Sequence, residues 1–159
     1  MTCFSYVLAR DYGFAPNPFG PYCTLATCKP GIRNSANIGD WVVGTGSVRH
    51  HGSEKLIFAM KVSEKLSFNI YWNDTRFLYK RLILNGSLKQ MYGDNIYFEA
   101  EGQWHQADSH HSNDDGTVNT YNLKRDTSCR FVLVSEHFFY FGSKAVRIPE
   151  EFLAQDGEW

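Results

Sequence analysis

The sequence has almost no net charge and no long apolar run. Its 16 Lys and Arg residues and 17 Asp and Glu residues leave a formal charge of −1, so the chain lacks the positive field that holds a protein along a duplex, and any phosphate binding must be local. The N-terminal residues lack the basic and apolar segments of a signal peptide, and no later run is long enough to span a membrane. We therefore expect a cytoplasmic protein without a membrane partner.

Closely spaced cysteine pairs are absent as well. Cys3, Cys23, Cys28 and Cys129 form no C-x-x-C hook of the kind that binds zinc or acts in thioredoxin-like redox sites. Four cysteines in a cytoplasmic chain of 159 residues are expected to be free thiols. We predict neither a metal nor another cofactor.

The composition that is present indicates one globular domain over residues 1–159. Hydrophobic residues make up 43% of the chain and charged residues 21%, which excludes a disordered chain, and there is no repeat, linker or low-complexity tract. Aromatic residues are abundant, at 16%. Such rings fill a small β core or stack on bases, and composition alone does not separate these uses.

The segment from residue 9 to residue 33, ARDYGFAPNPFGPYCTLATCKPGIR, carries the densest chemistry, and we name it the proline strap. It holds four of the chain's five prolines, which predicts a rigid connection over the surface that fixes its polar side chains before any ligand arrives. The alternative is an anchored loop whose polar groups only satisfy the backbone. The candidates for ligand binding in the strap are Arg10, Asp11, Tyr12, Asn17, Cys23, Thr24, Lys29 and Arg33.

Each candidate has a chemical role that suits a nucleotide. Lys29 and Arg33 are expected to contact an anion, because Arg offers a two-pronged donor to phosphate and Lys a point charge. Asp11 could orient a neighbouring Arg or accept a hydrogen bond from a ribose hydroxyl or a base amine. Tyr12 and Trp72 are candidates for a wall on which a base stacks. A second basic group at Lys80, Arg81 and Lys89 is either a phosphate patch or a solvated face.

A second polar cluster follows at Trp104–Asp115. His105, Asp108, His110 and His111 lie within seven residues and are ligand types for transition metals, but a loop gives them no fixed spacing. A lid that hydrogen-bonds the ligand and a merely solvated loop are the other interpretations. His50 and His51 are assigned to a hairpin tip.

A nucleophile is conceivable where these two segments meet. Cys23 or Cys28 beside Lys29 could act as a thiolate, with an imidazole from the His110 loop as its base. The sequence does not show that these groups are close in space.

Hydrophobic patterning predicts an α+β domain of mostly antiparallel strands in a curved sheet or open barrel, with one or two flanking helices. Glu101–Asn119, poor in aliphatic residues, is expected to be a long loop. A helical region is expected over Ser67–Leu84, with a break at Asn73-Asp74. The strands expected to share one sheet are Cys3–Ala9, Trp41–Ser47, Leu56–Val62 and Phe131–Ser135.

Two family resemblances bear on function. The order GDWVVGTGS, LIFAMKVSEKLSF and YWNDTRFLYKR resembles the first half of PUA-like barrels of the EVE, ASCH and YTH group. The segments ARDYGFAPNPF, YCTLATCKPGIR and LVSEHFFYFGSKAVRIP together look like the second of the bacterial and phage nucleotide-modification-associated domain families, over nearly the whole chain. This resemblance implies a place in systems that modify DNA bases and brings no catalytic residues with it.

The sequence therefore favours a module that binds a nucleotide or a modified base in a DNA-modification, defence or counter-defence system. Stacking and anion-binding residues are plentiful, whereas acid–base residues form no known motif. An enzyme that modifies a base or nucleotide, using the strap's Cys and Lys and the His/Asp loop, is the main alternative. A phage protein that sequesters a free nucleotide signal is another.

Overall fold

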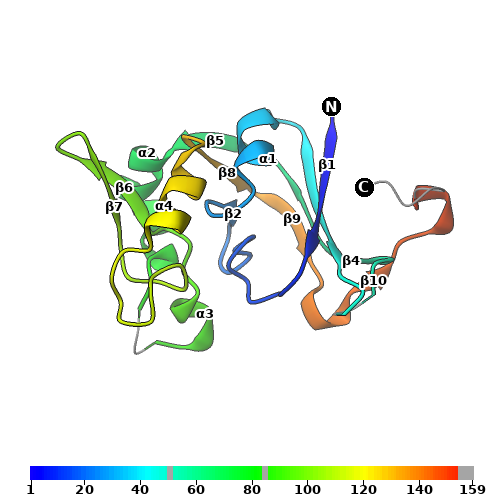
Figure 1. Ribbon diagram of the computed structural model, residues 1–159. Helices are drawn as coiled ribbons and strands as arrows, with labels where there is room; N and C mark the ends of the chain where they lie inside the picture. The colour runs from blue at the N-terminus through cyan, green and yellow to red at the C-terminus, as the bar shows by residue number, and fades with distance from the viewer. Residues whose placement is uncertain (50–51, 84–85, 154–159) are drawn as a thin grey trace.

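A computed structural model describes residues 1–49, 52–83 and 86–153 of the chain, so His50 and His51 lie outside the described residues. The structure is α+β with largely antiparallel strands, as predicted (Figure 1). The main sheet is five-stranded. In this sheet β1 and β3 pair in parallel, and all other neighbouring strands pair antiparallel. Its strands are β1 (Cys3–Leu8), β3 (Trp41–Gly46), β4 (Lys55–Lys61), β9 (His137–Tyr140) and β10 (Val146–Arg147).

Two smaller sheets complete the strands of the described residues. One is three-stranded and the other is a two-stranded ribbon, and both are antiparallel. The first holds β2 (Cys23–Leu25), β8 (Phe131–Ser135) and β5 (Glu64–Ser67), and the second holds β6 (Tyr97–Ala100) and β7 (Gln103–Gln106). These sheets are separate and open, and the resemblance to PUA-like barrels stays a prediction.

Short helices connect and cover the sheets, and none in the described part of the chain has the length and apolar character to cross a membrane. They are α1 (Pro30–Ser35), α2 (Phe68–Asn73), η1 (Thr75–Lys80), α3 (Leu88–Met91), α4 (Thr120–Thr127), η2 (Gly142–Lys144) and η3 (Glu150–Phe152). The predicted break at Asn73-Asp74 is confirmed. Asp74 ends α2 and begins η1, where its side chain accepts a hydrogen bond from the Arg76 amide at 2.9 Å.

The prediction that Phe131–Ser135 joins the main sheet is wrong. This strand is the centre of the three-stranded sheet, between β2 and β5. Val132 and Val134 pack into one hydrophobic cluster and Leu133 into the other, so β8 is buried on both faces. A strand buried on both faces reveals its burial through its sequence but not its partners.

The expected long loop at Glu101–Asn119 is also wrong in its first part, because β7 pairs with β6 there. In β7 exposed and half-buried residues alternate, so this strand needs few aliphatic side chains. The remainder of the segment runs as turns and bends to α4.

The proline strap is an anchored, largely buried segment. It lies between the main sheet and the part of the molecule that contains α4, β6 and β7 (Figure 1). Phe14 and Ala26 belong to one hydrophobic cluster, and Cys23 and Leu25 belong to the other. The strap thus passes between the two clusters.

Lys80 anchors the strap through hydrogen bonds to Asn17 and Tyr22. Its buried ammonium donates to both oxygens of Asn17, each at 2.8 Å, and to the Tyr22 carbonyl at 2.7 Å. Lys80 is therefore a structural residue, and the phosphate-patch interpretation of it is wrong. Burial lowers the pKa of this ammonium to about 8.

Candidate active site

Cys28 lies in a tight turn between β2 and α1. Its φ of 55° and the φ of 41° at Lys29 place two consecutive non-glycine residues in the left-handed region. Such backbone is uncommon and is concentrated at functional sites. The Cys28 side chain is half-buried and lines a cavity of about 240 Å³.

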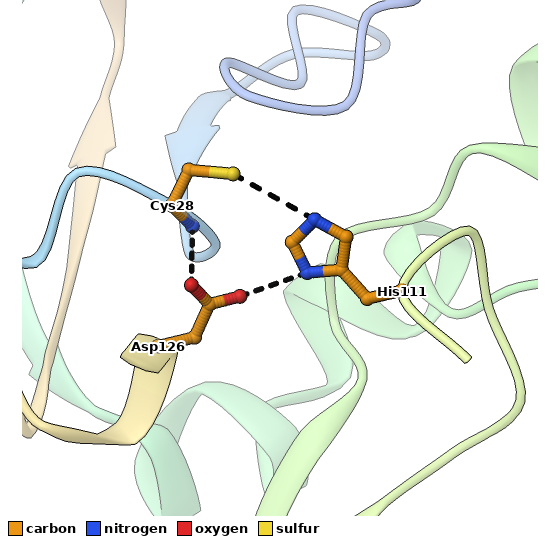
Figure 2. A group of neighbouring side chains, drawn as sticks. All are labelled: Cys28, His111 and Asp126. Atoms are coloured by element: carbon orange, nitrogen blue, oxygen red, sulfur yellow. Dashed lines mark hydrogen bonds and ion pairs between the residues drawn. The ribbon is translucent and has the colours of Figure 1, made fainter. Parts of the chain in front are cut away.

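Three side chains from distant parts of the chain meet at this turn (Figure 2). Cys28 comes from the strap, His111 from the segment after β7, and Asp126 from the last turn of α4. The Cys28 Sγ lies 3.7 Å from His111 Nε2, and His111 Nδ1 lies 2.8 Å from Asp126 Oδ2. The imidazole therefore bridges a thiol and a carboxylate through its two opposite nitrogens.

This geometry favours proton transfer from Cys28 to His111. A carboxylate accepts, so Asp126 favours the tautomer in which Nδ1 carries the proton and Nε2 turns its lone pair to the thiol. Asp126 also accepts the backbone amide of Cys28 at 3.0 Å. It therefore orients both the base and the turn that carries the nucleophile.

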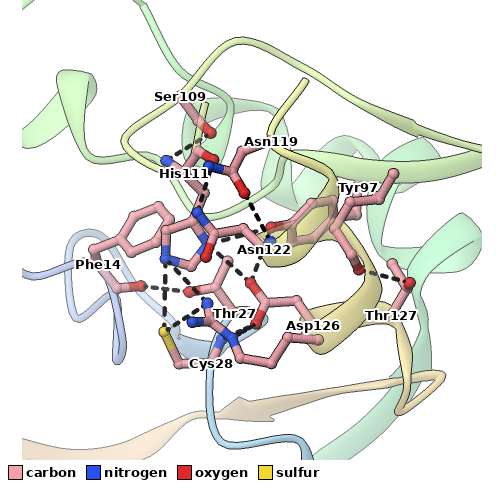
Figure 3. Close-up of polar contacts among 12 residues, drawn as sticks. Phe14, Thr27, Cys28, Tyr97, Ser109, His111, Asn119, Asn122, Asp126 and Thr127 are labelled. Carbon is pink, nitrogen blue, oxygen red and sulfur yellow. Dashed lines mark hydrogen bonds and ion pairs between the residues drawn. The ribbon is translucent and has the colours of Figure 1, made fainter. Parts of the chain in front are cut away.

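Further contacts hold the carboxylate and the imidazole in place (Figure 3). The Tyr97 hydroxyl donates to Asp126 Oδ2 at 2.9 Å, and Asn122 Nδ2 donates to the His111 carbonyl at 3.0 Å. Arg125 pairs with Asp126 Oδ1 at 2.9 Å, and its Nη2 lies 3.7 Å from Cys28 Sγ. A cation beside the sulfur stabilises a thiolate.

The protonation equilibria reflect burial and these partners. Burial alone would lower the pKa of His111, but the hydrogen bonds and charges of Asp126 and Cys28 raise it above its usual value. Burial alone would raise the pKa of Asp126, but hydrogen bonds from His111 and Arg125 hold it lower. Asp126 is therefore a carboxylate at neutral pH, and its charge favours the imidazolium that forms when His111 takes a proton.

The same three residues are a conceivable metal ligand set, since one ligand atom of each lies within 4.8 Å of the others. However, His111 turns Nε2 to Cys28 and Nδ1 to Asp126, so its ring stands between the sulfur and the carboxylate. A single ion would take only one of these nitrogens. The orientation of the ring fits a proton relay better than a metal centre.

The cavity beside Cys28 is bounded by the first half of the strap. Tyr12 stacks on Tyr92 with ring centres 5.3 Å apart and planes at 16°, and His110 meets both rings at a steep angle. Tyr12 remains 43% exposed, which leaves part of its ring free for a ligand. Asp11, another lining residue, accepts the Tyr140 hydroxyl at 2.8 Å.

The structure brings only some of the residues predicted from sequence to this cavity. Those that line it are Arg10, Asp11, Tyr12, Lys29, His110 and His111. Three others, Asn17, Cys23 and Thr24, are buried in the interior. Thr24 donates to the buried carboxylate of Asp94 at 2.7 Å, and burial raises the pKa of Cys23 to about 12, so these residues support the fold.

Arg33 was expected to contact an anion, and this is wrong. Its side chain is fully buried beneath the site. The guanidinium donates to the carbonyls of Cys28 at 2.8 Å, Phe131 at 2.7 Å and Asp126 at 2.6 Å. Arg33 thus joins the backbones of two of the three residues in Figure 2 and leaves no surface for a ligand.

Three further candidates lie outside the cavity. Trp72 stacks on Phe98 at 4.3 Å, and the Arg81 guanidinium covers its ring at 4.0 Å. His105, on β7, stacks on the same Phe98 at 5.1 Å. Asp108 is exposed, so the loop contributes only its two adjacent histidines to the cavity.

Sequence reasoning missed Asp126, Arg125 and Tyr97 as functional residues. It weighed Cys23 and Cys28 as alternatives, and the structure favours Cys28 because Cys23 is inaccessible. Asp126 follows Lys124 and Arg125 in a short polar helix and gives no signal that separates it from a solvated helix face.

Comparison with known proteins identifies one family. The family model described as nucleotide modification associated domain 2 matches residues 1–157, which confirms the resemblance noted in the sequence. No curated protein and no solved structure matches the chain.

Proposed function

Because the chain belongs to the nucleotide modification associated domain 2 family, its role is associated with nucleotide modification, and we propose that it is an enzyme that acts on a nucleotide or base through Cys28. The observation that carries this proposal is the bridge by His111 between the Cys28 thiol and the Asp126 carboxylate at the wall of a cavity. A nucleophile, a base within reach of it and a third group that orients the base form the arrangement used in covalent catalysis.

The proposed step is addition of the thiol to an electrophilic carbon of the substrate. His111 Nε2 takes the proton from Cys28 Sγ, and the sulfur electron pair forms the new S–C bond. The π electrons of the attacked carbon move to its bonded partner atom, and the imidazolium returns the proton to that atom, which completes the addition. Asp126 and Arg125 stabilise the charged pair while it exists.

Binding without turnover is the second candidate, and the aromatic group at the cavity favours it. Tyr12, stacked on Tyr92 and partly exposed, offers a ring face to a base. This function needs the stacking group and not the thiol. The two candidates therefore differ in their dependence on Cys28.

The test compares wild type with Cys28→Ser and Cys3→Ser. Cys3 is an exposed thiol on β1, so its replacement controls for loss of a thiol as such. Each protein is incubated with mononucleotides and short oligonucleotides, and the mixtures are analysed by chromatography and mass spectrometry. A new product with wild type and Cys3→Ser, absent with Cys28→Ser, supports the enzyme.

Two results would contradict an enzyme that acts through Cys28. The first is a product that persists in Cys28→Ser. The second is a nucleotide that binds equally to all three proteins and is recovered intact. The second result would identify a binding module.

A further inference from the structure

A second cavity adjoins the one beside Cys28, and we name it the outer cavity. Its volume is about 400 Å³, and it is lined by Ala9, Arg10, Ser47, Val48 and Arg49. Ala9 and Arg10 also line the cavity that contains Cys28. The two cavities therefore adjoin at Ala9 and Arg10, and we name the one beside Cys28 the inner cavity.

The outer cavity is positively charged. Arg10 and Arg49 are its charged lining residues, and both are exposed. No ion pair joins either guanidinium to an acidic residue within 1–49, 52–83 and 86–153. Asp11, which follows Arg10 in the chain, lines the cavity beside Cys28 and accepts a hydrogen bond from the Tyr140 hydroxyl.

The contrast between these exposed arginines and the buried cations Arg33 and Lys80 supports a role in ligand binding. Arg33 donates its hydrogen bonds to backbone carbonyls in the interior, and Lys80 donates to the two oxygens of Asn17 and to the Tyr22 carbonyl. Arg10 and Arg49 instead face a solvent-accessible hollow, where two planar guanidinium groups suit the oxygens of a phosphoryl group. The low net charge of the chain makes such a local pair the expected form of phosphate recognition.

The position of this pair also fits the remainder of the site. Tyr12 and His110 line the inner cavity next to Arg10. Burial and the positive charges of His111 and Arg10 lower the pKa of His110, which is consistent with Arg10 lying near the aromatic group. A ligand that is held at the outer cavity can thus place a base against Tyr12 and reach Cys28.

We propose that the outer cavity is a phosphate subsite, in which Arg10 and Arg49 hold a phosphoryl group of the substrate while its base occupies the inner cavity. This proposal rests on the proposed function in taking a nucleotide as the substrate. A free nucleotide and a nucleic acid strand carry the same phosphoryl chemistry, and the experiment separates them.

The first arm measures binding of inorganic pyrophosphate by calorimetry at low ionic strength. The proteins are wild type, Arg49→Ala, Cys28→Ser and, as a matched control, Arg130→Ala. Arg130 is an exposed arginine whose nearest carboxylate, that of Glu99, is 3.9 Å away. We expect Arg49→Ala to raise the dissociation constant by about fivefold or more and to weaken its dependence on salt, whereas Arg130→Ala leaves both within about twofold.

The second arm measures protection of Cys28 from iodoacetamide by thymidine, thymidine 5′-monophosphate and a short oligothymidylate. Stronger protection by the monophosphate than by thymidine supports the subsite and assigns it to free nucleotides. Stronger protection by the oligomer supports it and assigns it to a strand. In both cases Arg49→Ala is expected to remove the advantage over thymidine.

The proposal is overturned if wild type shows no saturable binding of pyrophosphate, if Arg130→Ala loses as much affinity as Arg49→Ala, or if thymidine protects as well as both phosphorylated probes. Its failure differs from that of the proposed function. Pyrophosphate binding is expected to survive in Cys28→Ser whether or not the thiol does chemistry. If the subsite proposal alone fails, wild type is still expected to form the Cys28-dependent product.

Discussion

Replacement of Asp126 by Asn tests the relay with almost no change of shape. Asp126 Oδ1 accepts the Cys28 amide at 3.0 Å and Arg125 Nε at 2.9 Å, and Oδ2 accepts the Tyr97 hydroxyl at 2.9 Å and His111 Nδ1 at 2.8 Å. The Cys28 and Arg125 groups can only donate, so the new amide must turn its oxygen to them. Its NH2 group then faces His111 Nδ1.

This orientation reverses the tautomer of His111. Nδ1 must accept from the amide, so Nε2 carries the proton and points a hydrogen toward Cys28 Sγ. The imidazole then has no lone pair available to the thiol. We expect the rate of the Cys28-dependent reaction to fall by about three orders of magnitude or more, the scale seen when the orienting carboxylate of a catalytic triad becomes an amide.

The same change affects stability and its pH dependence. Loss of a fully buried charge that pairs with His111 and Arg125 is expected to cost about 2–4 kcal/mol of unfolding free energy. In wild type the folded pKa of His111 is raised, so its stabilising contribution is complete below the ordinary value of about 6.5 and is lost as pH rises through the folded value. In Asp126→Asn burial and Cys28 still act on His111 but the carboxylate does not, so we expect the folded pKa of His111 to fall relative to wild type and the loss of stability at rising pH to become smaller.

NMR titration of the His111 ring and urea unfolding at several pH values measure these effects, with Asp114→Asn as the control. Asp114 is an exposed carboxylate in the same loop as His111. An unchanged His111 pKa in Asp126→Asn, or a loss of stability below about 0.5 kcal/mol, would refute the assignment of Asp126 as the orienting group.

Three other predictions follow from the same contacts. Arg33→Met leaves three buried carbonyls without their donor, so the free energy of unfolding measured in urea is expected to fall by about 3 kcal/mol or more. A decrease below about 1 kcal/mol, comparable to that of the control Arg130→Met, would contradict this role of Arg33. In the native protein iodoacetamide is expected to modify Cys28 and Cys3 but not Cys23, whose pKa burial raises to about 12; peptide mass spectrometry that finds Cys23 modified first would oppose this. Tyr12→Ala is expected to weaken binding of thymidine 5′-monophosphate by about 1–3 kcal/mol in calorimetry while pyrophosphate binding stays unchanged, and equal weakening by Phe139→Ala, at an exposed ring on β9, would exclude a specific stack.

The sequence was informative where a property belongs to a single residue or segment. It located the strap and the histidines that line the cavity, and it identified β8 as buried. It did not give the sheet to which β8 belongs, because burial on both faces is compatible with several partners. Propensity indicated a loop where β7 forms, since a half-exposed ribbon needs few aliphatic residues.

The site could be predicted only in part for a related reason. Lys29 and Arg33 have the same charge and lie four residues apart, yet Lys29 lines the cavity and Arg33 is buried beneath it. The six-residue helix α1 directs Arg33 toward carbonyls that come from β8 and α4, which are about 100 residues further along the chain. Asp126 comes from that distant region, so its relation to Cys28 exists only in the folded chain.

The position of Cys28 and Asp126 has a consequence for how the molecule fails. Cys28 follows a strand whose Cys23 and Leu25 belong to one hydrophobic cluster, whereas α4 packs Leu123 against the other cluster. The relay of Cys28, His111 and Asp126 therefore lies at the interface between the two hydrophobic clusters. Arg33 links the two sides of this interface through its hydrogen bonds to the carbonyls of Cys28 and Asp126. A small displacement of one cluster relative to the other would separate the Cys28 thiol from His111 while the packing within each cluster stayed intact. On warming or in dilute denaturant, the Cys28-dependent reaction is therefore expected to stop before circular dichroism records any loss of secondary structure.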